Sequence, residues 1–75
     1  MKELLLYMAQ NLVDHPEAVT VTEISGVETT LELRVAPEDM GKVIGRQGRI
    51  AKEIRTIVKS VAQRKGQHVN VEIIG

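Results

Sequence analysis

The stretch VIGRQGRIAKEIRTIVKS, residues 43–60, joins a glycine-containing turn to the start of a long amphipathic helix. Gly45 and Gly48 stand three residues apart, and glycine adopts backbone conformations that a side chain disfavours. From residue 49 to residue 65 the apolar residues fall on one side of a helix: Ile50, Ile54, Ile57, Val58 and Val61. The basic residues Lys52, Arg55 and Lys59 cluster on a neighbouring flank. The stretch therefore predicts a turn at the N-terminal end of a helix with one basic flank.

This turn has the properties of a phosphate-binding site. The first amides of a helix lack partners within the helix, and its N-terminal end carries a partial positive charge. Glycines let a phosphate backbone approach those amides closely, and Arg46 and Arg49 add positive charge. Two glycines three apart are weak evidence alone, because a turn that only ends a helix explains them about as well. The neighbouring basic flank is the feature that favours a phosphodiester ligand.

Two other glycine-rich phosphate sites do not fit the sequence. A nucleoside-triphosphate loop needs glycine, four residues, glycine, lysine and then serine or threonine. Gly41, Gly45 and Gly48 do not match that pattern. A dinucleotide fingerprint needs Gly-x-Gly directly after a strand, whereas these glycines follow the start of a helix.

Charge is distributed unevenly along the chain, although the formal net charge is zero. Residues 1–41 hold two basic and eight acidic residues, whereas residues 42–65 hold eight basic residues and one acidic residue. Such an uneven distribution of charge indicates a local positive field that would attract a polyanion. Charge runs also mark ordinary solvated helix faces, so composition alone leaves both interpretations open.

The apolar pattern predicts three elements before the glycine turn. A helix over residues 2–14 stops before Pro16. Alternating apolar residues then predict two strands, at residues 19–21 and 31–35, joined by a turn around Gly26.

Three further elements complete the predicted order helix, strand, strand, helix, helix, strand. Pro37, followed by two acidic residues, starts a short helix that ends at Gly45. The long helix runs from residue 49 to residue 65, and Gly66 caps it. Alternation over residues 69–73 predicts a third strand.

The opening stretch resembles the KH-domain signature, in which a hydrophobic residue and isoleucine precede Gly-x-x-Gly and an amphipathic helix. The order of elements resembles the type II, prokaryotic version of this domain. Nearly the whole chain fits, and it is similar to the small bacterial single-KH RNA-binding proteins of the KhpA family. Four segments carry the resemblance: the first helix, an Ala-Pro-Glu-Asp stretch, the glycine loop and an Ala-Lys-x-Ile-Arg helix, at residues 2–14, 36–39, 41–49 and 51–55.

The resemblance implies one α+β domain over residues 1–75, with three helices on one face of a three-stranded mixed sheet. It also implies a cleft for about four nucleotides of single-stranded RNA. Gly45, Arg46, Gln47 and Gly48 would clamp the backbone, while Val43, Ile44 and Ala51 would line the cleft opposite residues 33–35. Many KH domains have a larger aliphatic residue in place of Ala51. The candidate RNA-binding residues are Lys42, Val43, Ile44, Gly45, Arg46, Gln47, Gly48, Arg49, Ala51, Lys52 and Arg55.

Other side chains offer little support for catalysis, a metal or a cofactor. The chain has no cysteine, and His15 and His68 lie far apart in sequence with no obvious third ligand. No nucleophile has a recognisable base beside it, so we predict that the protein is not an enzyme. Tyr7, the only aromatic residue, is predicted to be a core or interface residue. The apolar stretch near the N-terminus is too short to span a bilayer, so we expect a cytoplasmic protein with no membrane partner.

Two functions from different classes remain. The first is an RNA-binding protein, acting as an RNA chaperone or post-transcriptional regulator. The second is an adaptor whose KH fold binds mainly protein. The resemblance implies pairing as a homodimer or with a larger KH-containing RNA-binding protein, and avidity would strengthen a single four-nucleotide site. The charge distribution favours RNA, and the apolar first helix favours a protein partner.

Overall fold

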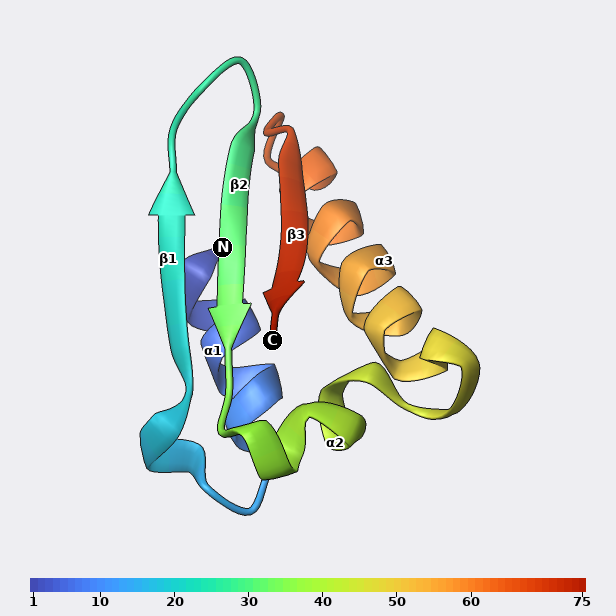
Figure 1. Cartoon of the computed structure of the whole chain (residues 1–75). Coiled ribbons are helices and arrows are strands. Elements are labelled where there is room, and N and C mark those ends of the chain that lie inside the picture. The colour runs from blue at the N-terminus through green and yellow to red at the C-terminus, as the bar shows by residue number, and fades with distance from the viewer.

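The computed structural model describes all 75 residues. Its helices and strands follow the predicted order: α1 (Lys2–Gln10), β1 (Thr20–Ile24), β2 (Thr29–Arg34), α2 (Met40–Ile44), α3 (Arg49–Arg64) and β3 (Val69–Ile74) (Figure 1). Three single turns of 3₁₀ helix lie between them, at Pro16–Ala18, Pro37–Asp39 and Arg46–Gly48. None of the helices is both long enough and apolar enough to cross a bilayer.

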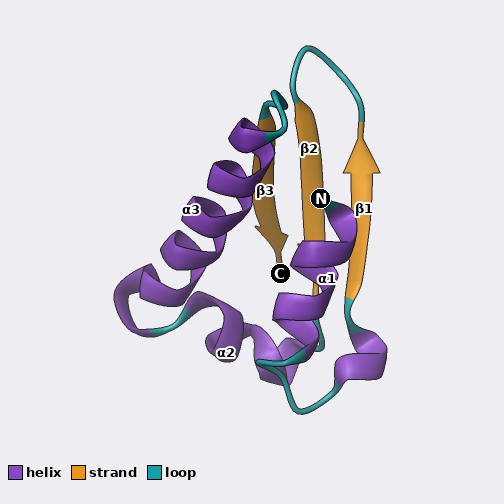
Figure 2. Cartoon of the chain, turned by 180° about the vertical axis from the view of Figure 1, so that it is seen from behind, coloured by secondary structure: helices purple, strands orange, loops and turns teal.

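The three strands form one mixed sheet, as predicted, and lie in it in the order β1-β2-β3. β1 and β2 are antiparallel, with Val21 opposite Leu33, and β2 and β3 are parallel, with Leu31 opposite Val71. A parallel pair needs a long crossover, which α2 and α3 provide. Figure 2 shows the helices on one face of the sheet. β3 is therefore an edge strand that lies beside α3, while the opposite edge belongs to β1.

The core lies between the sheet and the helices. Alternation along each strand turns one set of side chains toward the helices, and the spacing of α3 does the same for its apolar side. The core cluster consists of Leu5, Ala9, Val19, Val21, Leu31, Leu33, Val43, Ile54, Val58, Ala62, Val69 and Val71. Its members come from all six helices and strands and from the residue before β1, so the core fixes α2 and α3 against the sheet.

The ends of the helices show where local prediction succeeded and failed. Gly66 has a φ of 72° and donates its amide to the carbonyl of Gln63, which confirms the predicted cap. The prediction that the first helix reaches residue 14 was wrong, since α1 ends at Gln10. Asn11 follows it and donates its side-chain amide to the carbonyl of Tyr7 at 2.8 Å, which satisfies a helix-terminal acceptor. The predicted short helix is also divided, with a 3₁₀ turn at Pro37–Asp39 before α2.

Candidate nucleic-acid interface

The turn between α2 and α3 requires glycine for two different reasons. Gly45 has φ 76° and ψ 176°, and a Cβ built there would lie 2.6 Å from Cγ1 of Ile50. Gly48 has a φ of 73°, although a Cβ there would meet open space. Gln47, between them, is a non-glycine residue in the left-handed region, with a φ of 58°. Such backbone conformations are unusual and cluster at ligand-binding sites.

The residues between the glycines present their side chains to solvent. Arg46 and Gln47 are exposed, and neither side chain forms an ion pair or hydrogen bond within the protein. α3 begins at Arg49, so the positive end of its dipole lies at the turn. Backbone geometry, arginine charge and the helix dipole therefore act at the same place.

The two flanks of α3 differ in chemistry. Ala51, Ile54, Val58 and Ala62 are its buried residues. Lys52, Arg55 and Lys59 are exposed on the basic flank, and Arg55 donates from Nε to the carbonyl oxygen of Val71 in β3 at 3.2 Å. This hydrogen bond ties the basic flank to the edge strand and holds one guanidinium between them.

The flank toward α1 forms a second, apolar surface. A hollow of about 490 Å³ lies between the two helices, lined mainly by Tyr7, Met8, Leu12, Ile50, Ile54 and Ile57. Tyr7 is 66% exposed, so the prediction of a core position was wrong, while the alternative of an interface position stays a prediction. The apolar hollow and the basic flank thus occupy opposite sides of one helix.

The structure brings most of the predicted RNA-binding residues together on one surface but buries two of them. Gly45 to Arg49, Lys52 and Arg55 are at least partly exposed, and Ile44 is 37% exposed. Val43 is fully buried in the core, so its side chain lies below any surface that RNA could reach. Ala51 is 4% exposed and can offer at most a small part of its methyl group.

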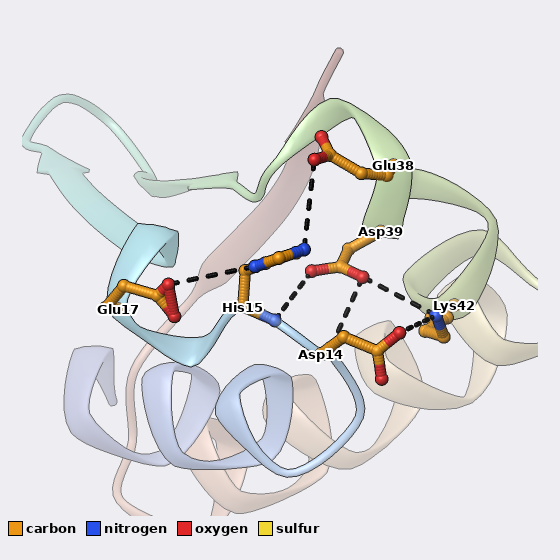
Figure 3. Close-up of polar contacts among 6 residues, drawn as sticks. All are labelled: Asp14, His15, Glu17, Glu38, Asp39 and Lys42. Atoms are coloured by element: carbon orange, nitrogen blue, oxygen red, sulfur yellow. Dashed lines mark hydrogen bonds and ion pairs between the residues drawn. The ribbon is translucent and has the colours of Figure 1, made fainter.

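Lys42 is held by carboxylates rather than pointing freely into solvent. Its Nζ lies 2.6 Å from Oδ2 of Asp14 and 3.6 Å from Oδ1 of Asp39 (Figure 3). The hydrogen bond to Asp14 is the main cause that raises the pKa of Lys42 above 10.5, although desolvation opposes it. A cation so close to two carboxylates contributes less positive potential to the surface around the turn than Lys52, which has no such partner.

Asp39 is the residue that sequence reasoning missed. Its side chain is 1% exposed, and its two oxygens accept the backbone amides of Asp14 at 3.2 Å and His15 at 2.9 Å (Figure 3). Burial alone would raise the pKa of Asp39, but the two amides, with His15 and Lys42 nearby, outweigh it and keep that pKa below 3.8. Asp39 thereby joins the start of α2 to the segment that follows α1. The sequence indicated only a carboxylate near a helix start, because the amide partners lie 24 and 25 residues away.

Comparison with known proteins agrees with this fold. The profile described as "KhpA/KhpB, KH domain" matches residues 2–73. The chain belongs to the KhpA/KhpB KH-domain family. Proteins named RNA-binding protein KhpA include one from Clostridium perfringens, 60% identical, and one from Clostridium acetobutylicum, 57% identical. Each alignment covers 99% of this chain and all of the relative.

The fold also recurs inside a larger protein. A structure of Era from Aquifex aeolicus bound to GDP and AlF4⁻ superposes with a TM-score of 0.70 over 96% of this chain. The match spans 28% of the Era chain at 20% identity, so it bears on the fold alone.

The KhpA/KhpB family is one of RNA-binding KH domains rather than of enzymes.

Proposed function

We propose that this protein binds single-stranded RNA, holding about four nucleotides with their backbone against the Gly45–Gly48 turn. The single observation that carries the proposal is the turn itself. Two glycines with positive φ angles frame the exposed, unpaired side chains of Arg46 and Gln47 at the positive end of α3. The basic flank of α3 continues from that turn, so a strand clamped there would follow Lys52 and Arg55 along the edge of β3.

The names of the relatives support RNA as the ligand. Proteins 57% and 60% identical over their full length are named for RNA binding. An RNA strand lying between β3 and the basic flank of α3 would have unstacked bases, so single strands should bind more tightly than duplex DNA. We further propose that the protein acts in the cytoplasm as an RNA chaperone or post-transcriptional regulator.

The apolar hollow between α1 and α3 supports a role for assembly. We propose that a second copy, or a larger KH-containing RNA-binding protein, covers Tyr7, Leu12 and Ile57 there. Two linked sites would raise the avidity of a binder that holds only a few nucleotides at each one. Light scattering at micromolar concentration should then give a mass above that of one chain, alone or after the larger partner is added.

The same hollow is the observation that favours the second candidate function, an adaptor that binds protein with little RNA affinity of its own. Salt dependence separates the two. If three or four phosphates are neutralised, log affinity for single-stranded RNA should fall against log salt with a slope of roughly −2 to −3, at about −0.7 per phosphate. Absent or salt-independent RNA binding would favour the adaptor.

A further inference from the structure

A polar hollow lies at the end of α3 opposite the glycine turn. It has a volume of about 270 Å³, and six of its seven lining residues are polar: Glu28, Lys59, Gln63, Gln67, His68 and Asn70. They come from the end of the β1–β2 hairpin, the last turns of α3 and the start of β3, which meet at one end of the molecule (Figure 1). The volume is below the range of about 300–1,000 Å³ found for drug-sized ligands, so a single nucleobase is an occupant of suitable size.

This hollow is continuous with the basic flank of α3. Lys59 follows Arg55 by four residues, so it lies one turn farther from the glycine turn on the same side of the helix. Lys59 lies eleven positions after Gly48, which corresponds to roughly 16 Å along the helix axis. An RNA strand that leaves the turn along Lys52 and Arg55 would therefore arrive at the hollow.

The hydrogen-bonding groups in the hollow favour particular bases. Asn70 donates from Nδ2 to Oε2 of Glu28, which links two of the lining side chains. That bond leaves Oδ1 of Asn70 and the remaining lone pairs of the carboxylate as acceptors. Lys59 forms no ion pair with any protein group and is the one cation in the lining. The hollow thus combines acceptors for a base edge with a cation for a phosphate.

We propose that this hollow is a base-binding subsite for a nucleotide beyond those clamped at the turn, and that it prefers a base with an exocyclic amino group. Adenine, cytosine and guanine each donate hydrogen bonds from such a group, and carboxylate oxygens accept them. Uracil instead has a carbonyl oxygen on each side of its single N–H. These oxygens would be repelled by the Glu28 carboxylate, because both are hydrogen-bond acceptors. Lys59 would contact the phosphate of the same nucleotide. The inference rests on the proposed RNA binding and deepens it.

The test compares tetrauridine, octauridine, and octauridines that carry one cytidine at successive positions. Fluorescence anisotropy at fixed salt should show that one cytidine, at a suitable position, binds about fivefold or more tighter than octauridine. Glu28→Ala should abolish this preference. Glu23→Ala is the matched control, because it removes the same charge from an exposed carboxylate outside the hollow. Both variants should bind octauridine slightly more tightly than the parent, since each removes one negative charge.

The side-chain amide signals of Asn70 in NMR spectra of the parent provide a second measurement that needs no variant. They should shift with the cytidine-containing octamer and remain unchanged with tetrauridine. A parent that binds all octamers equally, or a Glu28→Ala variant that keeps the preference, would overturn the subsite while leaving RNA binding intact. Failure of every oligonucleotide to bind would instead overturn the proposed function, and the subsite with it.

Discussion

The polar side chains at the two ends of α2 differ in whether they have partners within the protein. At its start, Asp39 is buried and each of its oxygens accepts a backbone amide, while Lys42 pairs with it from the next turn. At its end, the Gly45–Gly48 turn holds the exposed side chains of Arg46 and Gln47, which have no partner in the protein. The first arrangement satisfies its charges internally, whereas the second leaves them available to a ligand.

The difference shows how a chain of 75 residues can keep a binding loop in place. α2 has five residues, which is roughly 7.5 Å of helix, too short to be stable by itself. Val43 fixes it to the core and Asp39 fixes its start to the segment after α1. Because the start of α2 is anchored, the direction of its C-terminal end is fixed. The surrounding structure can then hold the turn in its unusual backbone conformation.

The largest effect should come from breaking the anchored end. Asp39→Ala leaves the amides of Asp14 and His15 without their acceptor and Lys42 without one of its two carboxylates. We expect the melting temperature to fall by about 5–15 °C, because partly buried amides that lose their hydrogen-bond acceptor destabilise the folded state. Thermal unfolding followed by circular dichroism measures it. Glu38→Ala, at the exposed neighbouring carboxylate, should change the melting temperature little. Equal effects of the two variants would contradict the anchoring role.

The same carboxylate predicts a pH dependence. Because folding lowers the pKa of Asp39 below 3.8, its stabilising contribution is present above that value and is lost as the pH falls through the lower pKa of the folded state. The stability difference between the parent and Asp39→Asn should therefore be largest near neutral pH and shrink below about pH 4. Denaturant unfolding at several pH values measures it, and a difference that stays constant down to pH 2 would contradict the assignment.

The two glycines of the turn should differ when each is replaced by alanine. Gly48→Ala places a residue in the left-handed region but meets no neighbouring atom, so it should cost about 1–2 kcal/mol. Gly45→Ala meets Ile50 as well and has a conformation that only glycine adopts readily, so we expect roughly 2–4 kcal/mol. Urea unfolding gives both values. If Gly48→Ala proves as costly as Gly45→Ala, contact with Ile50 does not determine the geometry of the turn.

The sequence was sufficient for the parts of the fold that depend on local pattern. Alternation located the three strands, and the 3.6-residue period of α3 separated its apolar side from its basic side, although Ile57 on the apolar side is 46% exposed. The turn was predictable because the positive φ angles of Gly45 and Gly48 are a local property of the backbone that favours glycine at these positions. Contacts between distant segments were not predictable, so the role of Asp39 and the pairing of Lys42 were missed. α2 is also too short to show a period, and hence the burial of Val43 could not be recognised.

A smaller effect should distinguish two lysines that look equivalent in the sequence. Lys52→Ala removes an exposed, unpaired cation and should make the salt slope of RNA binding less steep by about 0.7. Lys42→Ala removes a cation already paired with Asp14 and Asp39, so its slope should stay close to that of the parent. Anisotropy titrations over a range of salt concentrations measure both. A larger change for Lys42→Ala would place Lys42 in the interface after all.

Whether the Gly45–Gly48 turn binds RNA is tested by the RNA affinity of the double variant Arg46→Asp, Gln47→Asp. Its matched control is Lys2→Asp, Ser25→Asp, which changes the net charge equally at exposed positions outside the turn. Both variants should keep the parent's circular dichroism and melting temperature, since the turn geometry depends on Gly45 and Gly48. The control should bind single-stranded RNA nearly as well as the parent, whereas the turn variant should lose affinity roughly tenfold or more. A folded turn variant that binds RNA as tightly as the control would contradict RNA binding at the turn.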